Sequence, residues 1–196
     1  EVYATSGPRI AVRTYGGLNL QQAAIESAVF PANIQLQAVP MGGEIIGAAT
    51  EDRFSLIVEA QADPKSAYLD RIQIIKGWIA ASGQTHERVF DAAVSEVERR
   101  LADGSVMPVG SSVDLKTGLT PNTIGSPRLS VVWQDPDFDP KQSAFYYARV
   151  LQIPTARHSL LDKLALGDDG IDTRRPDTIQ ERAYTSPIWY RPSAGN

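Results

Sequence analysis

The stretch "WQDPDFDPKQSAFYYARV", Trp133 to Val150, is a corner of alternating aspartate and proline followed by a run of aromatic and aliphatic residues. Proline fixes its own φ angle and pushes the preceding residue out of helical conformation, and aspartate accepts hydrogen bonds from nearby backbone amides in turns. We therefore interpret DPDFDP as a rigid, charged corner between two strands, with Phe138 turned inward. The corner therefore predicts a strand on each side of it.

Outside this corner, several stretches have the alternation, or the β-branched and aromatic content, of strands. We expect strands at residues 9–16, 53–61, 69–79, 128–134, 144–153 and 182–190. Pro187 places the last of these at a sheet edge or a bulge. Residues 86–101 fit both helical spacing and strand alternation, and a hairpin turn at "ASGQ" favours a strand over 86–94 followed by a helical turn.

Helices are expected only in connections. One short helix would follow Asn19, and another would begin with Ser159 as its N-cap and end before Gly167. Many strands without repeated strand–helix alternation predict a mainly β fold, an immunoglobulin-like antiparallel β-sandwich with short helices in the connections. Residues 9–191 would form this single domain, and residues 192–196 a frayed tail.

The composition narrows the classes of partner. Nineteen lysines and arginines against 23 acidic residues give a net charge of −4 without any basic block, which argues against nucleic acid. The apolar runs are too short for a membrane-spanning helix, so we expect no membrane contact. The absence of cysteine excludes disulfides, cysteine-ligated zinc, iron–sulfur clusters and a thiol nucleophile.

The three aspartates of the corner also suggest a metal. Asp135, Asp137 and Asp139 match the first three ligand positions of a helix–loop–helix calcium loop. Pro140 stands where that loop needs glycine, and Tyr146 stands where it needs a bidentate glutamate. These departures exclude that loop type, and an irregular calcium site at the three aspartates remains an alternative.

No catalytic residue is assigned. The two histidines, His86 and His158, lack zinc-motif spacing. Ser159, next to His158 and near Asp162, would not complete a catalytic triad, because side chains on one short helix point apart.

Arg149 lies in an otherwise apolar strand, on the face that also carries Phe145, Tyr147 and Leu151. An arginine in such a strand usually pairs with a carboxylate or stacks on an aromatic ring. A structural role is the first interpretation. Ligand binding is the alternative, with Arg149, Tyr147 and Trp133 as candidate residues.

Five strings carry a resemblance to a known family: EVYATSGPRIAVR, LDRIQIIKGW, GQTHERVFD, WQDPDFDPKQSAFYYARVLQIPT and TIQERAYTSPIWY. Together they resemble the C-terminal part of a bacterial family, the domain of unknown function 3604 (DUF3604), over Glu1 to Tyr190. The strings RTYGGLNLQQAAIES and SEVERRLADGSVMPVGSSVDLKTGL depart from the family pattern and look like variable connections.

The resemblance implies a longer parent protein. Full-length members are similar to metal-dependent hydrolases of the polymerase-and-histidinol-phosphatase (PHP) type, whose histidine and aspartate ligands belong to an N-terminal catalytic portion. No such ligand maps onto this chain, so we expect no cofactor here and place any divalent metal in the full-length parent. The string VYATSGP resembles the end of the catalytic portion, so residues 1–8 would be that junction. Many members look exported, which favours a periplasmic or secreted parent.

The expected function is that of a noncatalytic C-terminal β-sandwich domain of a metal-dependent hydrolase-like protein. The domain would buttress the upstream catalytic portion or mediate subunit contacts, as in a homo-oligomer. Trp78, Trp133, Trp189 and the tyrosines motivate an alternative, a ligand- or glycan-binding module. A calcium-stabilised structural domain is the second alternative.

Overall fold

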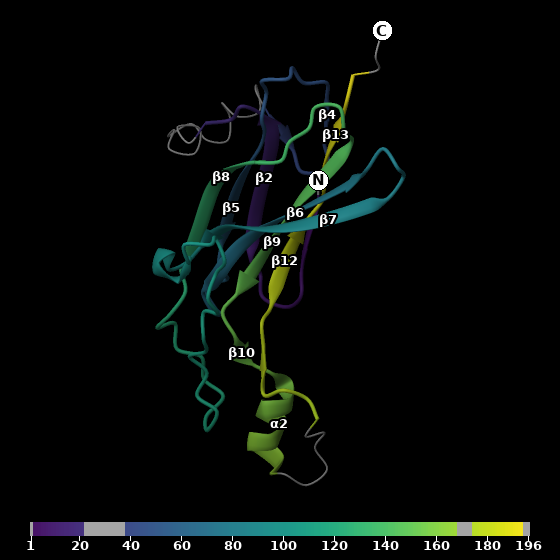
Figure 1. Cartoon of the computed structure of the whole chain (residues 1–196). Coiled ribbons are helices and arrows are strands. Elements are labelled where there is room, and N and C mark those ends of the chain that lie inside the picture. The colour runs from purple at the N-terminus through teal and green to yellow at the C-terminus, as the bar shows by residue number, and fades with distance from the viewer. Residues whose placement is uncertain (1, 22–37, 168–173, 194–196) are drawn as a thin grey trace.

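The computed structural model describes residues 2–21, 38–167 and 174–193 and contains two large β-sheets that face each other (Figure 1). The larger sheet consists of β1 (Tyr3–Thr5), β4 (Glu44–Ile46), β6 (Leu69–Ile79), β7 (Thr85–Val94), β9 (Ala144–Gln152), β12 (Arg182–Thr185) and β13 (Ile188–Arg191). The smaller sheet consists of β2 (Ala11–Leu18), β3 (Val39–Pro40), β5 (Phe54–Gln61) and β8 (Arg128–Gln134). The predicted mainly β sandwich is confirmed.

The connections contain the remaining elements. They are β10 (Thr155–Ala156), β11 (Thr178–Ile179), the 3₁₀ turn η1 (Val97–Arg99) and the helix α2 (His158–Leu166). Within the described ranges, no helix is long and apolar enough to cross a membrane.

Strand β9 is the centre of the larger sheet. It pairs with β6 on one side and with β12 and β13, in succession, on the other. The last predicted strand is therefore interrupted at Ser186 and Pro187, as the proline indicated. Strand β1 pairs with β12, so residues 3–5 are part of this sheet, and the only parallel pair among the described strands joins β13 to β4.

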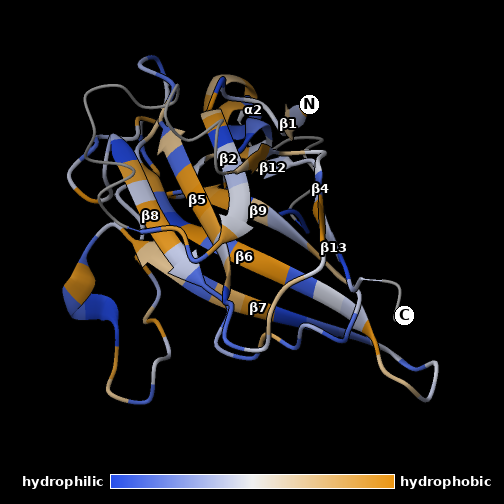
Figure 2. Ribbon diagram, turned by 90° about the horizontal axis from the view of Figure 1, so that it is seen from above, coloured by the Kyte–Doolittle hydropathy of each residue, from blue (hydrophilic) through white to orange (hydrophobic). Residues whose placement is uncertain are grey.

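The core lies between the two sheets. Alternate residues of β5, namely Phe54, Leu56 and Val58, are fully buried and pack in the same apolar cluster as Ile72 and Ile74 of β6. Figure 2 shows the smaller sheet lying across the larger one, with apolar residues along both. Burial of each such side chain contributes roughly 1.5–3 kcal/mol, so this interface holds the sandwich together.

Strand β2 continues through its two glycines. The sequence predicted its end at Gly16, but the strand runs to Leu18. A Cβ atom at Gly16 would lie 3.0 Å from Cδ1 of Ile188 and 3.3 Å from Cδ2 of Leu56. Glycine therefore allows the close approach of the two sheets here and does not end the strand.

Four local predictions remain, and three of them fall on described residues. Residues 85–94 form a strand followed by η1, as the hairpin argument favoured. The N-cap prediction at Ser159 is wrong, because its Oγ donates to the Pro176 carbonyl at 3.1 Å and α2 begins one residue earlier. Gly167, with φ of 80°, ends α2 as expected. The helix expected after Asn19 falls mostly outside the described residues.

Candidate functional site

The aspartate–proline corner contains a buried ion pair. Asp135 is fully buried, and its Oδ2 accepts hydrogen bonds from Lys76 Nζ at 2.6 Å and from the Tyr146 hydroxyl at 2.7 Å. Lys76 Nζ also donates to the Asp137 carbonyl at 2.8 Å. We call Lys76, Asp135 and Tyr146 the corner cluster. It ties β6 and β9 of the larger sheet to the end of β8 in the smaller one.

The other two aspartates of the corner have partners of their own. Asp137 forms an ion pair with Arg88, and Asp139 Oδ1 accepts the backbone N–H of Lys141 at 2.9 Å. Nowhere in the described ranges do three or more metal-ligating side chains gather in a group that could hold an ion. The carboxylates of the three calcium candidates thus have different partners.

Phe138 turns inward, as predicted. Its ring centroid lies 4.8 Å from that of Tyr190 and 6.1 Å from that of Phe54. The corner is therefore fixed by packing as well as by the ion pair.

Tyr146 gives the corner cluster a pH dependence. Burial, followed by the negative charge of Asp135, raises the pKa of the Tyr146 phenol above its ordinary value of about 10. Because the folded-state pKa is the higher one, stability from neutral Tyr146 is fully present below pH 10 and is lost as the pH rises further. We expect the free energy of unfolding to fall by up to about 1.4 kcal/mol per pH unit above 10 from this group.

Urea unfolding of the wild type and Tyr146→Phe between pH 8 and 11 measures this effect. The variant starts from a lower stability, since it loses the hydrogen bond to Asp135, but its stability should fall less steeply with pH. If the free energy of unfolding falls equally steeply with pH in the two proteins, Tyr146 is not the source of the pH dependence.

The predicted candidates Arg149 and Tyr147 lie together on the outer face of the larger sheet. Arg149 Nε donates to Gln73 Oε1 at 2.8 Å, and Gln73 Nε2 donates to Asp91 Oδ1 at 2.8 Å. A hydrogen bond with the Arg182 side chain, and a further one with Arg149, lower the pKa of Tyr184. Arg149 thus links side chains from β7, β6 and β12, which favours the structural role.

Trp133 is not part of this face. It is half-buried among core residues, with its ring 5.0 Å from Phe90 and 6.2 Å from Tyr146. The structure therefore brings two of the three predicted ligand-binding candidates together and places the third against the interior.

The outer face carries a row of four aromatic side chains, which we call the aromatic row. Its members are Trp189, Phe145, Tyr147 and Tyr184. Successive ring centroids lie 5.3, 6.4 and 6.4 Å apart. Sequence reasoning recognised the shared face of Phe145 and Tyr147, but the addition of Trp189 depends on the pairing of β13 with β9.

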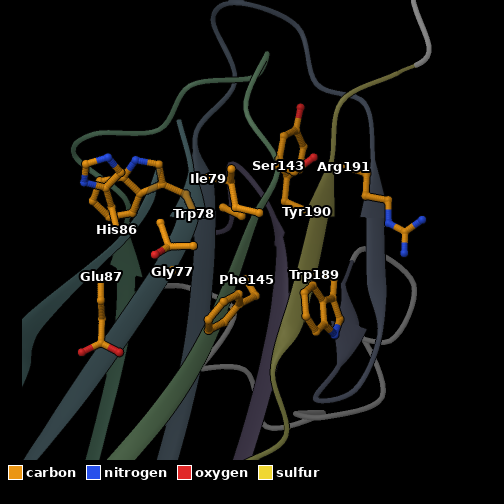
Figure 3. A pocket seen from close by; sticks show the side chains of 12 residues that line it. Gly77, Trp78, Ile79, His86, Glu87, Ser143, Phe145, Trp189, Tyr190 and Arg191 are labelled. Atoms are coloured by element: carbon orange, nitrogen blue, oxygen red, sulfur yellow. The ribbon is translucent and has the colours of Figure 1, made fainter. Parts of the chain in front are cut away.

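A groove of about 680 Å³ lies at the Trp189 end of the aromatic row. Figure 3 shows Phe145 and Trp189 side by side in it, with Glu87 toward one side and Arg191 toward the other. Strands β7, β6, β9 and β13 contribute its lining. We call this hollow the Trp189 groove.

A second surface lies at the end of the molecule that carries α2 (Figure 1). Five leucines there have large exposed fractions: Leu115, Leu119, Leu161, Leu164 and Leu166, at 52, 68, 47, 42 and 75%. Residues 114–119 form a tight turn in which Asp114 accepts the N–H of Lys116 and the hydroxyl of Thr117, both at 2.8 Å. A Cβ atom at Gly118 would lie 2.6 Å from Leu161 Cδ2, so the turn packs directly on α2.

We call these five residues the leucine patch. The sequence predicted the helix but not the exposure of its leucines, which depends on what the rest of the fold leaves uncovered.

Comparison with known protein families finds a match over almost the whole chain. A family model described as "Protein of unknown function (DUF3604)" matches residues 1–192. No curated protein and no solved structure matched the chain.

Proposed function

The chain belongs to the DUF3604 family, and from this premise we propose that it is a noncatalytic β-sandwich domain that buttresses an upstream, hydrolase-like portion of the same protein. The leucine patch is the observation that carries the proposal. Large exposed apolar patches on folded domains mark surfaces that bind another part of a protein. The docking partner is the upstream catalytic portion that the resemblance implies.

The arrangement of the patch supports a preformed docking surface. Leu160 of α2 is buried and fixes the helix to the domain, whereas Leu161 and Leu164 lie against Gly118 of the turn and remain half-exposed. The turn at 114–119 is held by its own hydrogen bonds. Little ordering of the backbone would therefore be needed on docking, which keeps the entropic cost of binding low.

In the parent protein, the upstream portion would carry the reaction and the divalent metal, and the present domain would supply rigidity and contacts. We place this parent protein in the periplasm or outside the cell. Assays of the chain and of the full-length protein with divalent metals and generic phosphoester, sulfate-ester and amide substrates test this division. Turnover by the isolated chain would contradict it.

We expect the double substitution Leu161→Glu with Leu164→Glu to release the domain from its upstream portion. A protease site placed directly ahead of Glu1 in the full-length protein allows the two parts to be separated and their association to be followed by size-exclusion chromatography. The wild-type parts should co-elute after cleavage. The double variant should weaken their association on the order of 100-fold, because two leucines lose their burial and two carboxylates face an apolar surface.

Ile46→Glu is the matched control. Ile46 is 68% exposed and lies on β4, at the opposite end of the molecule from α2 (Figure 1). This variant should co-elute like the wild type. Wild-type parts that separate on cleavage, or a double variant that stays associated, would overturn the docking proposal.

A further inference from the structure

The floor of the Trp189 groove is formed by two aromatic rings on neighbouring strands. Trp189 pairs across the sheet with Phe145, which in turn pairs with Gly77, so the three residues lie in one row. The two ring centroids are 5.3 Å apart with an angle of 51° between the planes. Trp189 is 45% exposed, although burial would be favourable for a side chain of this size.

Gly77 allows the Phe145 ring to lie close against the sheet. A Cβ atom at this position would overlap the Phe145 ring, so the ring lies directly over the glycine backbone. Any other residue at position 77 would lift Phe145 out of this position. The platform is thus built by a glycine and an aromatic residue on adjacent strands.

The rim of the groove carries hydrogen-bonding groups of both kinds. Glu87 from β7 lies on one side, and Arg191 from β13 lies on the other, where it forms an ion pair with Glu44 (Figure 3). Ser143 adds a hydroxyl. The rim therefore offers carboxylate acceptors, guanidinium donors and a hydroxyl around an apolar floor.

These features discriminate between classes of ligand. A peptide that extends a sheet needs a free strand edge, whereas this groove lies on the face of the sheet. Single-stranded nucleic acid needs a positively charged groove beside its stacking rings, whereas the one arginine of this lining, Arg191, is balanced by Glu87 and is already paired with Glu44. A neutral ligand with one apolar face and many hydroxyls satisfies both the rings and the rim.

We propose that the Trp189 groove binds a neutral saccharide built of hexopyranose units. The C–H face of one sugar ring stacks on Trp189 and that of the next on Phe145. Ring hydroxyls donate to Glu87 and accept from Arg191. This binding site is independent of the leucine patch, which lies on α2 and the turn at 114–119.

Titration with cellohexaose, maltohexaose and mannohexaose, followed by tryptophan fluorescence and calorimetry, tests the proposal on the full chain. At least one of these neutral sugars should bind and change the tryptophan emission, to which Trp78 and Trp189 of the groove both contribute. Trp189→Ala should weaken that binding at least tenfold, and Trp189→Phe should retain part of it. Glu87→Gln should weaken binding several-fold while the tryptophan fluorescence still reports it.

Leu166→Ala is the control, because Leu166 is exposed on α2 outside the groove. Unchanged melting temperatures of the variants show that they fold. The proposal is overturned if none of the three sugars binds at millimolar concentration, or if Trp189→Ala binds within twofold of the wild type. It is also overturned if sedimentation shows that the chain is a dimer and that Trp189→Ala makes it monomeric, because a second copy would then cover Trp189.

Discussion

Asp135→Asn is expected to lower the free energy of unfolding by about 3–5 kcal/mol, because it leaves a lysine charge buried without its counter-charge. The side chain of Lys76 is only 4% exposed and that of Asp135 is fully buried. The Lys76 ammonium lies 5.3 Å from the centre of the Trp78 ring and 5.7 Å from that of Tyr146, and these contacts are weaker than the lost ion pair. Urea unfolding at neutral pH measures the loss.

Asp137→Asn is the matched control two residues away. The side chain of Asp137 is 52% exposed, and its ion pair with Arg88 is open to water. Exposed pairs contribute at most about 1 kcal/mol, so this variant should remain close to the wild type. Equal losses of unfolding free energy in the two variants would show that the buried ion pair stabilises the fold no more than the exposed one.

A double variant separates two contributions to the free energy of unfolding: the penalty for an unpaired buried charge, and the stabilisation by the ion pair itself. Replacing a whole buried ion pair with apolar residues of similar size is often neutral or stabilising, whereas removing one partner is not. Lys76→Met combined with Asp135→Leu should therefore recover much of the stability that Asp135→Asn loses. A double variant as unstable as the single one would show that the cluster acts through hydrogen bonds to Tyr146 and the corner backbone.

The strands could be predicted because alternation is a local property of the sequence. Phe54, Leu56 and Val58 show by their spacing which residues of β5 share the face toward the larger sheet, and the same period groups Tyr147 with Arg149 on the opposite face of β9 from the core. The corner could also be predicted from local sequence, because each proline restricts the backbone of the residue before it wherever it occurs.

Other features depend on residues that are distant in the sequence. Lys76 is 59 positions from Asp135, and a lysine near the end of a strand gives no local sign that it points inward. Ser159 would cap α2 by local rules, but its hydroxyl finds the Pro176 carbonyl instead. The Trp189 groove has the same origin, because Trp189 meets Phe145 only through strand pairing.

Asp70→Asn is expected to cost about 3 kcal/mol, and its effect should spread toward the leucine patch. Asp70 is 1% exposed and accepts hydrogen bonds from Arg99 Nη2 at 2.6 Å, Arg71 Nε at 3.0 Å and Gln180 Nε2 at 2.9 Å. Arg99 is itself buried and also donates to the Met107 carbonyl at 2.9 Å. The carboxylate therefore fixes residues 97–107, the segment that leads from β7 toward the turn at 114–119.

Loss of one negative charge would leave Arg99 with its pairing to Glu96, which is why we expect the lower end of the range for a broken buried pair. Hydrogen–deuterium exchange should rise first in residues 97–107, and urea unfolding should report the loss of stability. Asp91→Asn is the control, since Asp91 is 22% exposed and also pairs with Arg71. If exchange in residues 97–107 is unchanged in Asp70→Asn, Asp70 does not order this segment, and the leucine patch owes its shape to contacts within α2 and the turn alone.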